Sequence, residues 1–388
     1  MQGISNKIAA PTFSAVGMHP AHETSKNLDI QVLRSVAILL VVGQHFKGRL
    51  PTPDWYLSAF AHIQFWSGVD VFFAISGYLI CQTFLRGLKE ASSPASAVRS
   101  FWIRRGLRLL PALYFWLAFS VACAFVLDTV WSAGPAKVFI SALTAVGGVS
   151  NLYWAHCVQT GIAACGNPDF NGVTWSLSLE WQFYALLSTL LLVCRRNAAV
   201  VILAGIALTL SFAPPNLFSY PWSLRPAAFA LGALIFVAQD SGHLHVERIP
   251  RAANRLLLAL GITICLLAPL QFPKSITLLS VGVGGALCLL SALRGNSYSQ
   301  RLGGRVLCWI GERSYSIYLC HLPCILIVHQ IVERLGMSAS TPKHVALAVI
   351  LTALLVAFAC ELSYRLIERR WMSRRAAAER PDHQTSPA

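Results

Sequence analysis

The sequence predicts an all-α polytopic membrane protein with about ten transmembrane helices and both termini in the cytoplasm. Of its 388 residues, 55% are hydrophobic and only 12% are charged, about half the charged fraction of an average soluble protein. Ten apolar segments each approach the roughly 17–25 residues that a helix needs to cross a bilayer. This composition excludes a soluble multidomain protein. It also excludes a disordered one, because disorder goes with few large apolar residues and dense charge.

The ten segments follow one another along most of the chain. They are, in order, about 28–48, 67–86, 108–131, 173–194, 197–213, 222–239, 254–270, 274–293, 313–333 and 343–366. An eleventh apolar stretch, about 137–150, is shorter and contains two glycines. We expect one membrane domain, residues 28–372, between an N-terminal tail of residues 1–27 and a basic to polar tail of residues 373–388.

The distribution of charge predicts the orientation. The chain has 31 Lys and Arg against 16 Asp and Glu, a net charge of +15. If the eleventh stretch does not cross and the N-terminus is cytoplasmic, 24 basic residues lie inside and 7 outside. Membrane proteins carry excess Lys and Arg in cytoplasmic loops, so we expect residues 132–172 to form an outer excursion with a half-inserted helix. The charge is spread over many loops without a long basic run, so we expect no nucleic-acid partner.

The eleven cysteines include one candidate disulfide pair. The sequence has no C-x-x-C pair, and most of its cysteines lie in apolar runs, where Cys behaves as a small hydrophobe. Cys157 and Cys165 instead lie in the polar outer excursion. Because an outer compartment is oxidising, we expect a disulfide between them, the alternative being two unpaired thiols. We expect no cleavable signal peptide, since the first 27 residues are polar and contain prolines.

Ionisable residues inside the predicted spans are the candidates for function, because each costs roughly 2.5–3.5 kcal/mol at mid-helix. Arg34 and His45 lie eleven residues apart in the first span. This spacing is about three helical turns, so the two share a face and are separated by roughly 16 Å along the axis. Arg34 then lies near the inner surface and His45 in the outer half. The alternative is a snorkelling Arg and a His that only caps the helix.

The next two spans each begin with charged residues. Asp70 lies near the outer end of the second span, where it needs a partner, and His45 is one possibility. Arg105 and Arg108 precede the third span at i,i+3 and share a face, whereas Arg104 points elsewhere. These arginines are either topology signals or a clamp for an anion, because the planar guanidinium binds two phosphate oxygens at once.

Glu180 lies about one and a half turns into the apolar fourth span. It shares a face with Ser176 and Tyr184 at i±4 spacing. A carboxylate in this position needs a proton or a partner. It is therefore a catalytic candidate or, alternatively, a structural hydrogen-bond node.

Two later spans supply candidate substrate-binding residues. Arg225 lies near the outer end of one, followed by Pro226. In the ninth span, Ser314, Tyr318 and His321 share a face. Pro323 follows and disturbs the helix beside it, which often marks a cavity. Ser314 and Tyr318 could instead only hold helices together.

The sequence predicts no metal site. The run His19-Pro-Ala-His22-Glu23 has the wrong order for a zinc protease, and Pro20 prevents a helix there. We also find no nucleotide-binding loop of the Walker or G-x-G-x-x-G type.

Taken together, these stretches resemble the acyltransferase-3 family of integral membrane acyltransferases, over about residues 28–372. The landmarks stand in the family's order: the Arg-x10-His of Arg34 and His45, the Gly-Val-Asp-Val-Phe-Phe…Ser-Gly-Tyr-Leu-Ile run around Asp70, the Arg-x-x-Arg-x-x-Pro of Arg105, Arg108 and Pro111, the Trp-Ser-Leu-Ser-Leu-Glu block ending at Glu180, and the Ser-Tyr-Ser-Ile-Tyr-Leu-Cys-His run ending at His321. The chain departs from the family at Cys320, where Trp is frequent, and at Glu368-Arg369-Arg370, where Arg-Pro is frequent.

The resemblance implies transfer of an acyl group, commonly acetyl from acetyl-CoA, to a hydroxyl of a cell-surface or secreted sugar. The protein would then be a multi-pass protein of the bacterial plasma membrane, surrounded by lipid, with acyl-CoA and a glycan or glycolipid as its partners. It resembles the stand-alone type, without a fused outer domain.

The residues suit that chemistry independently of the resemblance. An imidazole has an unperturbed pKa of about 6.5, suited to a general base, so His45 is the expected base, oriented by Asp70 or Glu180. Arg34, Arg105 and Arg108 are expected to hold the phosphates of CoA. Transfer within a ternary complex is preferred to an acyl-His intermediate.

A transporter or flippase of a glycan or lipid-linked intermediate is the main alternative, with the buried charges lining a pathway. It predicts no dependence on CoA, and the absence of an internal repeat counts mildly against it. A purely structural scaffold fits poorly with so many buried ionisable groups.

Overall fold

A computed structural model describes residues 27–127, 134–161, 165, 169–295, 297–301 and 303–372. The described part is helical throughout and contains no strand. Most of the two predicted tails, residues 1–26 and 373–388, lies outside the described residues. The first half of the chain forms α1 (Leu28–Phe46), α2 (Asp54–Ala59), α3 (Gly68–Glu90), α4 (Pro94–Val126), α5 (Pro135–Val146), α6 (Ser150–Thr160) and α8 (Thr174–Val193). The second half forms α9 (Arg196–Thr209), η1 (Leu210–Phe212), α10 (Tyr220–Leu224), α11 (Ala227–Asp240), η2 (Val246–Arg248), α12 (Arg251–Gln271), α13 (Thr277–Leu293), α14 (Gly304–Glu312), α15 (Ser314–Arg334), α16 (Pro342–Ser363) and the π-helical turn η3 (Tyr364–Glu368).

The expected polytopic membrane protein is confirmed. Within the described residues, eight helical segments are long and apolar enough to cross a membrane. They are Leu28–Phe46, Gly68–Glu90, Pro94–Val126, Thr174–Val193, Tyr220–Asp240, Arg251–Gln271, Ser314–Arg334 and Pro342–Met372. The other two expected spans correspond to the shorter apolar helices Ala198–Phe212 and Thr277–Leu293.

The eleventh apolar stretch contains a helix too short to span. α5 has 12 residues, so it is about 18 Å long at about 1.5 Å per residue, against a hydrocarbon core of about 30 Å. This length agrees with the expected half-inserted helix.

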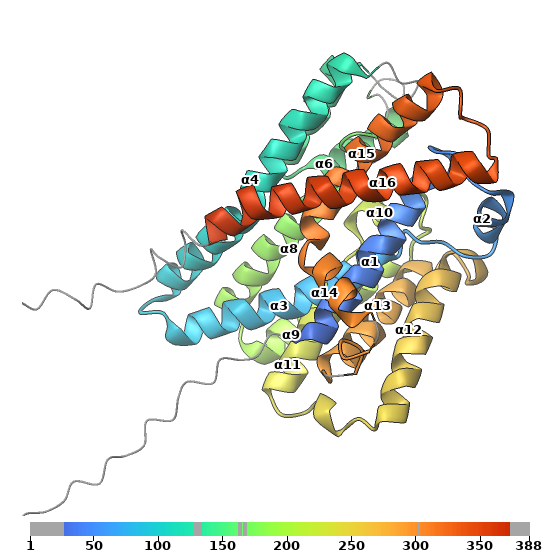
Figure 1. Cartoon of the computed structure of the whole chain (residues 1–388). Coiled ribbons are helices and arrows are strands. Elements are labelled where there is room, and N and C mark those ends of the chain that lie inside the picture. Colours follow the sequence, from blue (N-terminus) through green and yellow to red (C-terminus); the bar gives the residue numbers. More distant parts are fainter. Residues whose placement is uncertain are drawn as a thin grey trace, which may run out of the picture.

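The helices pack into one bundle (Figure 1). Its central helices are buried, and its peripheral helices expose apolar side chains. α1 packs against α3, α13, α14 and α15, and α3 packs along α11. The apolar window of α15 is 78% buried inside the bundle, whereas those of α12 and α16 are 22% buried. The ionisable residues predicted to function lie mostly on the central helices α1, α3, α8 and α15, so they face protein rather than lipid.

Two glycines fix the position of α3 against α11. A Cβ added to Gly77 would lie 2.0 Å from the carbonyl oxygen of Phe229, and one added to Gly232 would lie 2.0 Å from that of Ala74. Real atoms do not approach this closely, so the two backbones touch only because both residues lack side chains. The crossing holds the polar residues of α3 at a fixed depth in the bundle.

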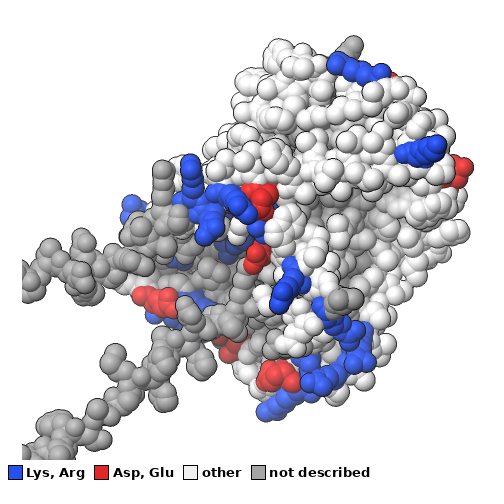
Figure 2. All heavy atoms as spheres, in the orientation of Figure 1, with Lys and Arg blue, Asp and Glu red and all other residues white. Residues whose placement is uncertain are grey.

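Basic residues gather at one end of the bundle, which we call the basic end. It comprises the connections α3–α4, α11–α12 and α13–α14 with the helix ends beside them, where the chain carries Arg86, Lys89, Arg99, Arg104, Arg248, Arg251, Arg294, Arg301 and Arg305. Figure 2 shows Lys and Arg concentrated over the lower left of the molecule, with few at the opposite end. We call that opposite end, where α1 runs toward α2, the His45 end.

The predicted disulfide is confirmed. Cys157, in α6, is bonded to Cys165. The bridge closes a loop of eight residues' separation, part of which lies outside the described residues.

Candidate active site

Three neighbouring cavities run through the centre of the bundle. The Arg86 cavity is lined by Arg34, Tyr78, Arg86, Arg108, Glu312, Tyr364 and Glu368, among others. The Glu180 cavity is lined by Arg34, Val69, Ser76, Arg105, Arg108, Ser176, Glu180, Tyr184, Ser314 and Tyr318, among others. The His45 cavity is lined by Gln44, His45, Arg49, Gln64, Trp66, Val69, Trp175, Phe218, Trp222 and Tyr318, among others. Arg34 and Arg108 line the first two, and Val69 and Tyr318 line the last two, so the three adjoin in a row.

The cavities differ in size. The Arg86 cavity holds about 490 Å³, the Glu180 cavity about 100 Å³ and the His45 cavity about 390 Å³. The row is therefore wide at both ends and narrow in the middle.

Three arginines, Arg34, Arg105 and Arg108, line the Glu180 cavity together. Arg34 on α1 is held by Ser314 of α15, which accepts from its Nε at 3.1 Å and its Nη2 at 2.8 Å. Arg105 lies between the rings of Phe101 and Tyr184, at 5.8 and 5.7 Å from their centroids. Arg104 lines none of the three cavities and donates to Ser100 on its own helix.

Glu180 is the carboxylate of the narrow middle cavity. Its Oε1 accepts from the hydroxyl of Ser76 at 2.6 Å and from that of Tyr184 at 2.5 Å. Among the described residues Oε2 has no hydrogen-bond partner, and Glu180 lines the cavity. The predicted face of Ser176, Glu180 and Tyr184 is confirmed, since all three line this cavity. Glu180 does not contact His45.

Tyr318 lies where the Glu180 and His45 cavities adjoin. Its hydroxyl donates to the carbonyl oxygen of Val173 at 2.9 Å and lies 2.6 Å from the hydroxyl of Ser176. Tyr318 is therefore fixed between α15 and the start of α8, where it lines both cavities.

His45 contacts a second histidine. Its Nδ1 lies 2.9 Å from the carbonyl oxygen of Val41 and 3.1 Å from Nε2 of His321. Nδ1 of His321 lies 3.1 Å from the carbonyl oxygen of Ile317. This pair sits where α1 crosses α15, and His321 is fully buried.

The two carbonyl groups assign the protons, because a carbonyl oxygen only accepts. Nδ1 of His321 carries a proton for Ile317, so its neutral ring leaves Nε2 as an acceptor. Nδ1 of His45 carries a proton that Val41 and His321 share. The neutral ring of His45 therefore presents an unprotonated Nε2, which has no partner among the described residues and belongs to a side chain lining the His45 cavity. This tautomer follows from the hydrogen-bond pattern.

Asp70 does not contact His45, in contrast to the pairing considered from the sequence. Its Oδ1 accepts from Nε of Arg225 at 3.0 Å, and each side chain is at most 3% exposed. Both residues are charged and buried, so each neutralises the other at lower cost than either would bear alone. The orienting contact on His45 comes instead from His321.

Arg225 does not line any of the three cavities, in contrast to its predicted direct role in substrate binding. Its guanidinium carbon lies 4.8, 4.7 and 4.4 Å from the ring centroids of Trp66, Trp175 and Trp222. These three rings do line the His45 cavity. Arg225 thus supports the wall of that cavity from behind.

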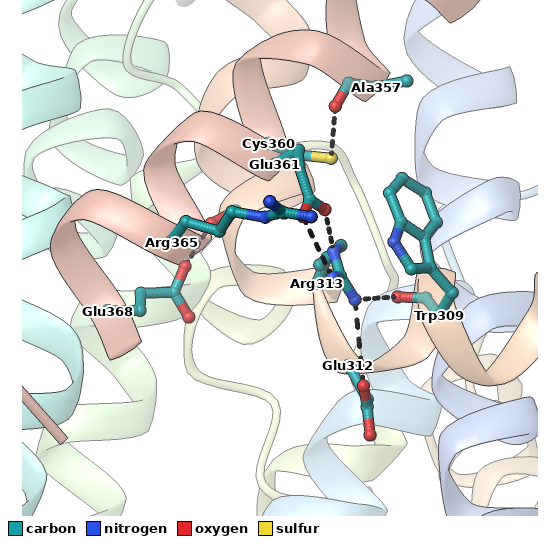
Figure 3. Close-up of polar contacts among 9 residues, drawn as sticks. Trp309, Glu312, Arg313, Ala357, Cys360, Glu361, Arg365 and Glu368 are labelled. Carbon is teal, nitrogen blue, oxygen red and sulfur yellow. Dashed lines mark hydrogen bonds and ion pairs between the residues drawn. The ribbon is translucent and has the colours of Figure 1, made fainter. Parts of the chain in front are cut away.

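A second arginine cluster supports the Arg86 cavity at the opposite end of the row. Arg313 lies between Trp309 and Tyr364, 4.5 and 4.7 Å from their ring centroids, and its guanidinium bonds Glu361. Figure 3 shows Arg313 at the centre of these contacts, joining the start of α15 to the end of α16. Tyr364 and Glu368, which follow on η3, line the Arg86 cavity. The cluster fixes that wall.

The sequence located most of the side chains but few of their partners. Arg34, Glu180, Ser314 and Tyr318 line the cavities, and His321 lies behind His45 without lining any of them. Sequence reasoning missed Ser76, Arg86, Arg49 and the tryptophan wall. Pro323 lies inside α15 without ending it. Within the described part of the chain, no group of three or more His, Cys, Asp or Glu is placed to hold a metal ion.

Comparison with known proteins decides the family. The family model described as "Acyltransferase domain" (Acyl_transf_3) matches residues 27–362. The chain belongs to the acyltransferase-3 family. The resemblance noted from the ordered motifs is thereby confirmed for nearly the whole membrane domain.

Three relatives illustrate what the chain is similar to. "Putative peptidoglycan O-acetyltransferase YrhL" of Bacillus subtilis is 27% identical over 370 residues, covering 87% of this chain and 53% of the relative. "Peptidoglycan O-acetyltransferase OatA" of Listeria monocytogenes is 27% identical over 369 residues, covering 87% and 54%. "Putative membrane-bound transacylase BcsY" of Komagataeibacter xylinus is 29% identical over 366 residues, covering 89% and 83%. The chain thus spans about half the length of the first two relatives. No solved structure matches it.

Proposed function

We propose that this protein transfers an acyl group, foremost acetyl, from acyl-CoA to a hydroxyl of a sugar or a surface or secreted glycan. The observation that carries the proposal is the row of cavities: several arginines line one end, and an unprotonated His45 nitrogen lies at the other. The printed names of the relatives, two peptidoglycan O-acetyltransferases and a membrane-bound transacylase, support both the reaction and the acceptor class.

The arginines of the Arg86 and Glu180 cavities suit the donor. Arg34, Arg86, Arg105 and Arg108 supply planar cationic forks that bind phosphate oxygens two at a time. The phosphates of CoA would occupy these cavities, and the uncharged pantetheine arm would extend through the narrow Glu180 cavity toward Tyr318. The thioester then lies where the Glu180 and His45 cavities adjoin.

His45 acts as the general base in this proposal. The acceptor hydroxyl attacks the thioester carbonyl carbon while Nε2 of His45 takes the hydroxyl proton. The new C–O bond forms and the C–S bond breaks, and the proton on His45 passes to the departing thiolate to give free CoA. His321 is a positioning residue: it accepts from Nδ1 of His45, and it keeps Nε2 of His45 unprotonated and directed at the acceptor.

The remaining predicted catalytic residues act at a distance from the reacting atoms. The negative charge of Glu180 partly neutralises the positive charge of the three arginines that line its cavity. Ser76 and Tyr184 hold its carboxylate in place through hydrogen bonds. Asp70 holds Arg225 and, through it, the aromatic wall of the His45 cavity.

The basic end faces the cytoplasm in this proposal, where acyl-CoA is found, and the membrane is the bacterial plasma membrane. The concentration of Lys and Arg at that end supports this orientation (Figure 2). A membrane-impermeant maleimide applied to intact cells should label Ser58→Cys, exposed at the His45 end, and spare Ser92→Cys, exposed at the basic end. The reverse pattern would contradict the orientation.

The test of function is acetyl transfer by the purified full chain in lipid nanodiscs, supplied with labelled acetyl-CoA and a glycan. His45→Ala should lower kcat by about 100- to 10,000-fold, the usual contribution of a general base, with the thermal midpoint unchanged. His62→Ala, an exposed imidazole that lines none of the three cavities, is the matched control. Full activity in the His45→Ala variant would refute the base assignment.

A row of cavities would also suit a transporter or flippase. That function predicts movement of a glycan across vesicles without acetyl-CoA and no acetylated product. The acetyl-transfer measurement separates the two, because a transporter would leave the label on CoA.

A further inference from the structure

The His45 cavity has a wall of three indole rings that the transfer chemistry does not use. Trp66 precedes α3, Trp175 lies in the first turn of α8, and Trp222 lies in α10. The ring centroids of Trp175 and Trp222 are 4.2 Å apart, and those of Trp66 and Trp222 are 6.4 Å apart. Because three distant segments converge here, the wall is built by the fold and is not a run of sequence neighbours.

The wall is rigid. The guanidinium of Arg225 contacts all three rings and is itself held by the buried carboxylate of Asp70. Trp175 and Trp222 are only 5% and 4% exposed, so their rotamers are fixed by packing. A surface that is ordered before the ligand arrives costs little entropy on binding.

Among the described residues, no unpaired cationic side chain lines the His45 cavity. Arg49, its one charged lining residue apart from the imidazole, is bonded to Asp169 at 2.5 Å. The other polar lining side chains include the amides Gln44 and Gln64. A ligand with a carboxylate or phosphate would find no free cation here, unlike in the Arg86 and Glu180 cavities.

The indole nitrogens add hydrogen-bond donors. Within the described residues, the N–H groups of Trp66, Trp175 and Trp222 donate to no protein atom, and none of them is among the buried polar atoms that lack a partner. Each N–H is therefore accessible. Because a tryptophan N–H usually finds a partner when it lies in an enclosed site, hydroxyl oxygens of a ligand are suitable acceptors.

The cavity opens at the His45 end. Pro215 and Leu217 of the connection between η1 and α10 form part of its lining, and Leu217 is 64% exposed. Its volume, about 390 Å³, falls within the roughly 300–1,000 Å³ of small-molecule sites. A ligand can thus enter from the end opposite the arginines.

We propose that the His45 cavity is the acceptor site and that it binds an uncharged sugar ring against Trp66, Trp175 and Trp222. A sugar ring has a C–H face that packs on indole and hydroxyl groups at its edge that suit the N–H donors and the glutamine amides. A hydroxyl on the side of the ring that faces α1 then lies beside Nε2 of His45. The inference rests on the proposed function, since it assigns the acceptor half of the same reaction.

Binding and transfer are measured separately on the purified full chain in nanodiscs. The binding probes are two neutral tetrasaccharides, of β-1,4-linked N-acetylglucosamine and of β-1,4-linked glucose, with tetragalacturonate as the anionic comparison. The variants are Trp66→Ala and Trp66→Phe, because Trp66 is half-buried and the least packed of the three. Trp55→Ala, a tryptophan that is 72% exposed and outside the cavity, is the matched control.

At least one neutral tetrasaccharide should bind, and tetragalacturonate should bind at least ten-fold more weakly. Trp66→Ala should weaken neutral-sugar binding, and raise the acceptor KM, by about ten-fold, the upper range of an aromatic contact, with the KM for acetyl-CoA unchanged. Trp66→Phe should restore most of the affinity, and Trp55→Ala should behave as the unmodified protein. The inference is overturned if neither neutral sugar binds, if the anionic one binds more tightly, or if Trp66→Ala has no effect. Sugar binding without acetyl transfer would instead refute the proposed function and leave this site standing.

Discussion

The Arg86 and Glu180 cavities differ from the His45 cavity in how their arginines are used. In the Arg86 and Glu180 cavities, the guanidinium groups of Arg34, Arg86, Arg105 and Arg108 form part of the lining themselves. At the His45 end, Arg225 lies behind the wall against Asp70, and Arg49 is bonded to Asp169. The same residue type therefore lines the cavities in one region and supports a cavity wall from behind in the other. In the proposed function, the first arrangement receives the negatively charged donor and the second leaves the acceptor cavity without a free cation among the described residues.

The largest expected effect is a loss of folding stability when Asp70, which holds Arg225 behind the wall of the His45 cavity, is replaced. Asp70→Asn leaves Arg225 buried without its counter-charge, and breaking a buried pair in this way costs about 3–5 kcal/mol. Denaturant unfolding in detergent micelles should show this loss. Lys89→Ala, which breaks the exposed Lys89–Asp240 pair, should cost at most about 1 kcal/mol.

A double replacement sharpens this test. Asp70→Leu combined with Arg225→Leu removes both charges, and such replacements are often neutral for stability. We expect it to recover most of the lost stability. An equal loss in the single and double variants would mean that charge burial is not what Asp70 contributes.

The next largest effect, on the KM for acetyl-CoA, is expected from replacing the arginines that line the Glu180 cavity. Arg105→Ala combined with Arg108→Ala should raise the KM for acetyl-CoA by about 100-fold or more, since each hydrogen bond to a charged group contributes about 1.5–3 kcal/mol. The acceptor KM should not change. Lys at both positions should rescue only partly, because it lacks the planar fork.

Arg104→Ala is the matched control, because Arg104 lies on the same helix and outside the cavities. If the double alanine variant kept its affinity for acetyl-CoA, these arginines would be topology signals only.

A smaller effect, on kcat, is expected from replacing His321. His321→Leu should lower kcat by about 10- to 100-fold, as is typical for a residue that orients a functional side chain through a hydrogen bond, with both KM values unchanged. His321→Gln should restore part of the rate, because its amide oxygen can accept from Nδ1 of His45. A purely structural role would instead change both variants alike and move the thermal midpoint.

The smallest effect is expected at Ser314. Ser314→Ala frees Arg34 from two hydrogen bonds and should raise the KM for acetyl-CoA by about two- to ten-fold, from a net value of about 0.5–1.5 kcal/mol. Thr83→Ala removes a longer contact to Arg105, 3.4 Å, and should change this KM less. The opposite order would show that Arg34 is not held by Ser314 when the donor binds.

The difference between relations within one helix and contacts between helices explains what the sequence could predict. Helical spacing identified the residues that face inward together, such as Glu180 with Tyr184 and Tyr318 with His321, because those relations lie within one helix. It also identified the fold class, since length and apolarity decide whether a helix can span. The helical periodicity of each segment does not show which helices pack against each other.

The contacts that define the site are long-range. Asp70 and Arg225 are 155 residues apart, and His45 and His321 are 276 apart. The sequence therefore suggests His45 only as one possible partner of Asp70, whereas the packing of α3 along α11 brings Asp70 to Arg225. The wall of Trp66, Trp175 and Trp222 was missed because isolated tryptophans near helix ends look like ordinary interfacial anchors.

The narrow Glu180 cavity has a consequence for the membrane's ion gradients. A path from one side of a bilayer to the other would conduct protons if water filled it continuously. Here the middle cavity holds only about 100 Å³, and the hydroxyl of Tyr318 is hydrogen-bonded to Val173 and Ser176 where this cavity adjoins the His45 cavity. The pantetheine arm of the proposed donor is a thin chain that suits a cavity of this size, and when bound it would take up space that water otherwise fills. In the proposed reaction, this small middle cavity lets the donor and the acceptor reach the site from two compartments without a continuous water-filled path between them.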